Sequence, residues 1–73
     1  MKELIEYIAR GLVDNPAAVS VKETRGANVT MLELRVDSKD MGRVIGKEGR
    51  VANAMRTLLR VAAGDRRVTL DIE

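Results

Sequence analysis

The sequence predicts an α+β fold in which three helices pack on one face of a three-stranded mixed sheet. Three observations carry this prediction. Apolar residues recur at helical spacing in two segments, they alternate with polar residues in three others, and the 73 residues suffice for one small domain spanning 1–73. In chain order the segments are helix, strand, strand, helix, helix and strand, which is a two-layer arrangement.

The first helix is predicted over residues 2–13. Its apolar side chains are spaced three or four apart: Leu4, Ile5, Ile8, Ala9 and Leu12. We expect it to end at Asp14-Asn15-Pro16, because a proline disfavours the helical conformation of the residue before it. Tyr7 lies in this helix and is expected in the core or at its rim.

Two strands follow, over residues 18–24 and 29–37, joined by a hairpin turn at Arg25-Gly26-Ala27-Asn28. Apolar and polar residues alternate in both, which is typical of a sheet with one buried and one wet face. The inward side chains are expected to be Val19, Val21, Leu32, Leu34 and Val36.

Ser38 is a candidate N-cap for a short helix through about Val44, and a longer helix is predicted from Arg50 to Ala63, with Gly64 as its C-terminal cap. The longer helix has an apolar stripe of Val51, Met55, Leu58, Leu59 and Ala62 and a polar side of Arg50, Asn53, Arg56, Thr57 and Arg60. The last strand is predicted over residues 67–72, with Val68, Leu70 and Ile72 inward. Because a two-helix crossover joins it to strand 29–37, these two strands should be parallel.

The segment between the two helices, Gly46-Lys47-Glu48-Gly49, is the candidate site. Two glycines three apart permit a tight turn and a close approach of another backbone. The amides past Gly49 open a helix, and a helix N-terminus binds anions. Lys47 should pair with phosphate. The carboxylate of Glu48 either faces the same phosphates and opposes binding or lies near the helix N-terminus, where a negative charge is stabilising, and we expect it to weaken the affinity without abolishing it. The full set of candidate nucleic-acid contacts is Arg43, Ile45, Gly46, Lys47, Glu48, Gly49 and Arg50.

Ile45 is the leading candidate for an apolar groove beside this loop. Val44, Val51 and Ala52 are further candidates, and the strand around residues 32–36 is expected to supply groove wall. Each of these side chains is otherwise an ordinary core residue.

The positive charge is concentrated around the loop. Residues 38–63 hold six basic and two acidic side chains, a net charge of +4, whereas the whole chain has only +2. Clustered positive charge indicates a polyanionic partner.

Composition excludes several classes. The chain has no cysteine and no histidine, which removes disulfides, thiolate metal sites and the commonest general base, and no metal or cofactor site is expected. No pair of carboxylates is placed for acid–base work, so an enzyme is disfavoured. With a single aromatic residue, base stacking on several exposed rings is also disfavoured. We expect no signal peptide and no membrane span.

The segment from Asp40 to Arg50, DMGRVIGKEGR, resembles the signature of the KhpA family of small bacterial RNA-binding proteins with a single type II KH domain. The end of the first helix at Asn15-Pro16 and the stretch Arg56-Thr57-Leu58 fit that family too. The resemblance implies a cytoplasmic, non-enzymatic protein that grips single-stranded RNA through its GxxG loop. It further implies a homodimer, a larger KhpB-type partner, no small-molecule substrate, and a role as post-transcriptional regulator or RNA chaperone linked to cell elongation and division.

Two alternatives stay open. The chain could be a KH-shaped protein-interaction module without useful RNA affinity, or its ligand could be single-stranded DNA. Salt-sensitive binding to single-stranded RNA, and competition between RNA and DNA of one sequence, discriminate among the three. Met41 and Met55 are candidate dimer contacts.

Overall fold

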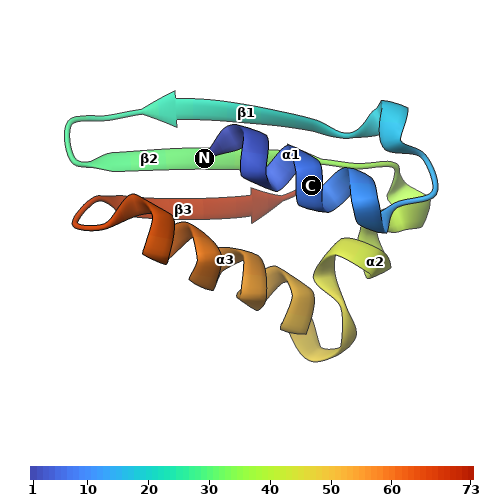
Figure 1. Cartoon of the computed structure of the whole chain (residues 1–73). Helices are drawn as coiled ribbons and strands as arrows, with labels where there is room; N and C mark the ends of the chain where they lie inside the picture. Colours follow the sequence, from blue (N-terminus) through green and yellow to red (C-terminus); the bar gives the residue numbers. More distant parts are fainter.

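A computed structural model describes residues 1–73 and has the predicted order of elements, α-β-β-α-α-β (Figure 1). The helices are α1 (Lys2–Leu12), α2 (Met41–Ile45) and α3 (Arg50–Ala63), and the strands are β1 (Ser20–Arg25), β2 (Val29–Arg35) and β3 (Arg67–Ile72). Three short 3-10 turns lie at Pro16–Ala18, Ser38–Asp40 and Lys47–Gly49. No helix is both long and apolar enough to cross a membrane.

The three strands form one mixed sheet in the order β1-β2-β3. β1 pairs with β2 antiparallel, with Val21 opposite Leu34. β2 pairs with β3 parallel, with Leu32 opposite Leu70, so the prediction for the crossover is confirmed. β3 is therefore an edge strand, and the two-helix crossover that carries the loop leads directly into it.

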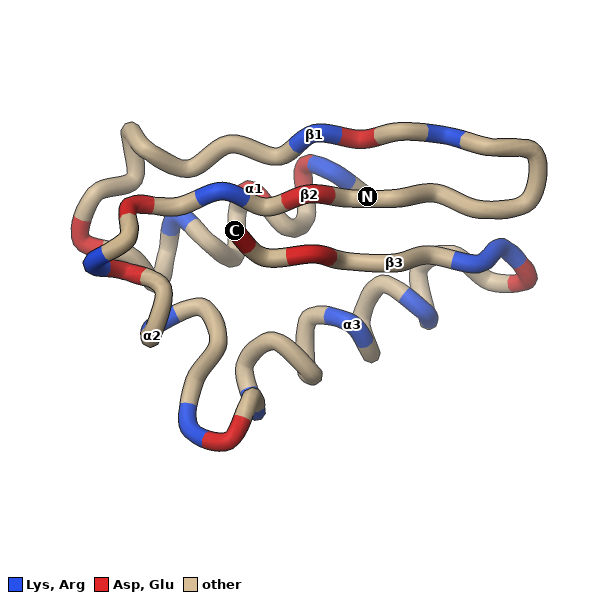
Figure 2. Tube along the Cα trace, turned by 180° about the vertical axis from the view of Figure 1, so that it is seen from behind, with Lys and Arg blue, Asp and Glu red and all other residues tan.

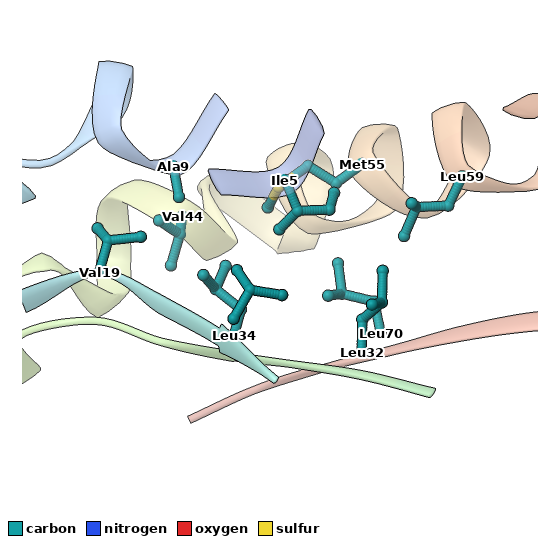
Figure 3. Packing of buried hydrophobic residues seen from close by; sticks show 10 residues of the cluster. Ile5, Ala9, Val19, Leu32, Leu34, Val44, Met55, Leu59 and Leu70 are labelled. Carbon is teal, nitrogen blue, oxygen red and sulfur yellow. The ribbon is translucent and has the colours of Figure 1, made fainter. Parts of the chain in front are cut away.

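The core lies between the helices and one face of the sheet, where the side chains of α1, α2 and α3 point toward those of the strands (Figure 3). Full burial of a Leu or Ile side chain contributes about 1.5–3 kcal/mol, so this layer holds the loop's two flanking helices in place. The ten residues of the core cluster are Ile5, Ala9, Val19, Val21, Leu32, Leu34, Val44, Met55, Leu59 and Leu70.

The expected start of the second helix was wrong. Asp37, not Ser38, is the cap: its carboxylate accepts hydrogen bonds from the backbone N–H of Lys39 at 3.0 Å and from the side-chain amide of Asn15 at 3.2 Å. These two hydrogen bonds, the backbone one foremost, lower the pKa of Asp37. A 3-10 turn then precedes α2, so the α-helix itself begins only at Met41.

Several strand and helix ends also differ by one or two residues. The first helix ends at Leu12, since Val13 is already extended. The first strand begins at Ser20 because Pro16–Ala18 form a 3-10 turn, and the second strand ends at Arg35.

Some apolar residues are less buried than their spacing predicted. Tyr7 is 81% exposed on α1, so neither core nor rim describes it. Leu58 is 48% exposed and Ala62 is exposed as well, because they lie on the flank of α3 that no other element covers. Met55, in contrast, is 1% exposed and belongs to the core, so it is not an interface residue.

Candidate nucleic-acid interface

The loop between α2 and α3 extends away from the sheet (Figure 1, yellow). Three of its four residues have a positive φ: Gly46 has φ 77° and ψ 174°, Glu48 has φ 57°, and Gly49 has φ 76°. Gly46 occupies a region that is essentially restricted to glycine, and a glutamate with positive φ is uncommon. The backbone of the loop therefore has a specific, strained shape.

The two glycines are required for different reasons. A Cβ on Gly46 would lie 2.5 Å from Cγ2 of Val51, a contact that real side chains do not make. A Cβ on Gly49 would meet nothing closer than the side-chain amide of Asn53 at 3.8 Å, so only the positive φ favours glycine there. The fold alone is thus a sufficient reason for both glycines. The predicted close passage of a ligand backbone is a second, separate reason.

The charges of the loop are exposed. Lys47 has no carboxylate partner, whereas Glu48 lies 3.9 Å from the guanidinium of Arg50 in a pair that is more than 70% exposed on both sides. Such a pair has little energy in water. Gly49 gives α3 no side-chain cap, so amides of its first turn are left for an anion.

Arg43 points elsewhere. Its guanidinium lies 3.1 Å from the carboxylate of Asp14 and 3.7 Å from that of Asp40, which links α2 to the end of α1. Since both partners are acidic, its charge is largely compensated. Among the predicted cations, Lys47 is the one left without a carboxylate partner.

Asp40 has a structural role that its place in the sequence does not indicate. It is 3% exposed, and its two oxygens accept hydrogen bonds from the backbone N–H groups of Asp14 and Asn15 at 3.2 and 3.1 Å. The local sequence around Asp40 does not indicate these hydrogen bonds, because the partners lie about 25 residues away. It fixes the α1 end against α2 and so positions the helix that leads into the loop.

A groove of about 460 Å³ lies beside the loop, between α3 and the end of β3. Ile45 borders it and is 37% exposed, as expected of a groove residue, whereas Val44 is fully buried in the core. The wall is supplied by β3 and not by residues 32–36, since β2 is the inner strand and its edges are paired. The residues that line the groove are Ile45, Gly49, Ala52, Arg56, Asp71, Ile72 and Glu73.

The structure thus adds three charged residues to the site that were not predicted there: Arg56, Asp71 and Glu73. The parallel crossover could have indicated them, because it places β3 at the edge that α3 covers. Figure 2 shows basic positions on the loop and along α3, and acidic ones toward the end of β3. No group of acidic residues is arranged to hold a metal ion. The arrangement is suited to an anion at the loop and an uncharged, partly apolar group in the groove.

Comparison with known proteins shows the family of the chain. Residues 2–73 match the family model described as KhpA/KhpB, KH domain. The chain is 54% identical over 63 residues to the RNA-binding protein KhpA of Clostridium perfringens, covering 86% of this chain and 84% of that protein. It is 49% identical over 74 residues to KhpA of Clostridium acetobutylicum, covering 99% of each, and 45% identical over 73 residues to KhpA of Chlamydia trachomatis, covering 100% of this chain and 94% of that protein.

No solved structure matches the chain. The order of elements, the mixed three-stranded sheet and the three helices on one face are those of the type II KH fold. With a family model that matches nearly every residue, the chain belongs to the KhpA/KhpB KH-domain family.

Proposed function

We propose that this protein binds single-stranded RNA, with the sugar–phosphate backbone against the loop Gly46–Gly49 and the bases in the groove beside it. The observation that carries the proposal is the uncapped N-terminus of α3 next to the unpaired ammonium of Lys47, at the mouth of the groove. Donors for a phosphate and a partly apolar slot for a base then lie side by side. The names of the relatives agree with this function.

Each residue of the site has its own part in this proposal. Lys47 pairs with a phosphate, and Gly46 and Gly49 keep the backbone free of side chains where the strand passes. Arg50 contributes charge beside the helix N-terminus, partly offset by Glu48, whose carboxylate lowers the affinity. Ile45 contacts a base. Arg43 acts indirectly, since its ion pairs hold α2 in position.

The proposed biological role rests on the resemblance to the family. We propose a cytoplasmic, non-enzymatic regulator or RNA chaperone that acts in cell elongation and division. It would pair with a second copy of itself and with a KhpB-type partner. Exposed apolar side chains on α1 and α3, notably Tyr7, Leu58 and Val61, are available for such contacts. Two clamps on one strand raise the affinity of a weak site through effective concentration.

Fluorescence anisotropy with a labelled single-stranded RNA at low and moderate salt tests RNA binding and the clamp together. The test variant is Lys47→Asp with Glu48→Asp, which keeps both glycines and places aspartate, a residue that tolerates positive φ, at position 48. Lys2→Asp is the control, because it changes the net charge by the same amount as the loop variant does. Lys2 is the first residue of α1 and lies far from the loop. We expect the wild type and the control to bind alike and the loop variant to lose about tenfold or more in affinity, because it loses a phosphate contact. Each lost phosphate contact should also reduce the salt slope by about 0.7.

The outcomes separate the proposals. If the folded loop variant binds like the wild type, the RNA contacts lie elsewhere. If neither the wild type nor the variants bind RNA at low salt, the protein-interaction module is the better description. The carboxylates of Glu48, Asp71 and Glu73 near the groove favour that alternative, because they repel phosphate. Competition between RNA and DNA of the same sequence decides which sugar is preferred, because a contact to the 2′-hydroxyl is specific to RNA.

A further inference from the structure

The side chain of Arg56 crosses from α3 to the edge strand β3. Its Nε and Nη2 both donate to the backbone carbonyl oxygen of Leu70, at 3.3 and 3.1 Å, and its Nη1 donates to Oδ1 of Asn53 at 3.4 Å. No carboxylate forms an ion pair with it. Three donors on one planar group fix the orientation of the guanidinium as well as its position.

Arg56 separates two hollows. On the side of the loop lies the groove already described, of about 460 Å³, and on the other side lies a second hollow of about 440 Å³. Arg56 and Asp71 line both of them. The other residues that line the second hollow are four polar ones and two apolar ones: Asn53, Thr57, Arg60, Thr69, Val68 and Leu70.

We propose that the guanidinium plane of Arg56 is a stacking platform for an RNA base, which takes the place of the aromatic residues that this chain lacks. The proposal rests on the proposed RNA binding. Bases in single-stranded RNA stack on aromatic rings or on arginine guanidinium planes. The only aromatic residue, Tyr7, is on α1 and lines neither hollow. A planar cation fixed at its edges keeps its faces free, and a base can then lie against it in either hollow.

The hydrogen bonds of Arg56 use its edge and leave its plane to the ligand. They also occupy the carbonyl of Leu70, an acceptor on the open edge of the sheet that a bound base could otherwise use. Base selection in this groove would then depend on stacking and on the carboxylate of Asp71 more than on that carbonyl. Lysine has the same charge but neither the plane nor the fork, so Arg56→Lys removes the stacking surface, together with the hydrogen bonds to Leu70, at constant net charge.

The test compares the wild type, Arg56→Lys and Arg66→Lys in titrations with one labelled single-stranded RNA at several salt concentrations. Arg66, in the turn before β3, makes no side-chain hydrogen bond or ion pair and is the matched control. We expect Arg56→Lys to weaken binding about fivefold or more, since about fivefold is the low end of what one stacked base contributes, with the salt slope unchanged. Arg66→Lys should bind like the wild type.

A second measurement needs no substitution. In the wild type, the Nε–H resonance of Arg56 is followed by NMR during addition of the RNA. A stacked base shifts this proton upfield through its ring current, whereas a phosphate that hydrogen bonds to the guanidinium shifts it downfield. A downfield shift, or Arg56→Lys binding as tightly as the wild type, would overturn the stacking proposal while leaving RNA binding intact; failure of the wild type to bind overturns the proposed function itself.

Discussion

Gly46→Ala should be the most destabilising single substitution in the loop. Two independent effects add. The backbone at φ 77° and ψ 174° is a glycine-only conformation, which costs about 1–3 kcal/mol for another residue. The new Cβ would also lie 2.5 Å from Cγ2 of Val51, and overpacking of this kind costs about 1–3 kcal/mol. The free energy of unfolding should therefore fall by at least about 2 kcal/mol.

This loss is large for so small a domain. At about 0.05–0.15 kcal/mol per residue the whole chain has a stability of roughly 4–11 kcal/mol. A loss of about 2 kcal/mol lowers Tm by at least about 8 °C in a domain of this size. Thermal and urea unfolding followed by circular dichroism measure both quantities.

Two controls distinguish the effects. Gly49→Ala has the positive φ but open space, so it should cost only about 1–2 kcal/mol. Gly42→Ala in α2 has neither problem and should be neutral or stabilising by up to about 1 kcal/mol.

A double variant with Val51→Ala removes the methyl group that causes the clash. Gly46→Ala should then cost less in the Val51→Ala background than in the wild type, by roughly 1 kcal/mol. Equal costs at Gly46 and Gly49, or no coupling between Gly46 and Val51, would refute the reasoning from the loop geometry.

Two further predictions concern the contacts that position α2. Asp40→Ala should lower the free energy of unfolding by about 1–3 kcal/mol, because the N–H groups of Asp14 and Asn15 lose their acceptors. Asp40→Asn keeps an acceptor and should cost less. Urea unfolding together with hydrogen exchange at those two amides measures both effects, and equal effects of the two substitutions would contradict the prediction. Because its hydrogen bonds lower the pKa of Asp37, this carboxylate should titrate below its ordinary value of 3.8 in an NMR pH titration. The small stabilisation that the carboxylate contributes should be present above pH 3.8 and be lost as the pH falls through the folded-state pKa. A titration midpoint at or above 3.8 would contradict the cap.

The periodic signals predicted the architecture well, because they report directly on burial. The alternation in residues 29–37 identified Leu32 and Leu34, which face the helices, and the two-helix crossover correctly implied a parallel β3. Short-range patterns were less informative where long-range contacts decide. Asp37 is the cap, in place of Ser38, because its carboxylate accepts the backbone N–H of Lys39; Asn15, more than twenty residues away, donates to the same carboxylate and adds a contact that no local pattern reveals.

The candidate site shows the same division. The loop and its glycines could be found from their spacing, but the groove wall could not be assigned without the strand order, since it depends on which strand lies at the edge. Helical spacing also does not reveal how wide a stripe of a helix the sheet covers. Burial of Leu58 was therefore expected from its spacing, although this side chain is half exposed. The partners of Arg43 and Asp40 come from the end of α1 and are invisible to a local pattern.

The pairing of charges determines how this site should bind. Of the basic residues near the loop, Arg43 is compensated by two carboxylates and Arg50 lies beside Glu48, so the concentrated charge of the sequence is reduced where it would meet the RNA. Lys47 and Arg56 have no acidic partner, one at the loop and one across the groove. Few phosphate contacts mean a shallow dependence on salt and a low affinity for one domain. We therefore propose that the remaining affinity comes from the groove, through Ile45 and the plane of Arg56, or from a second domain on the same strand.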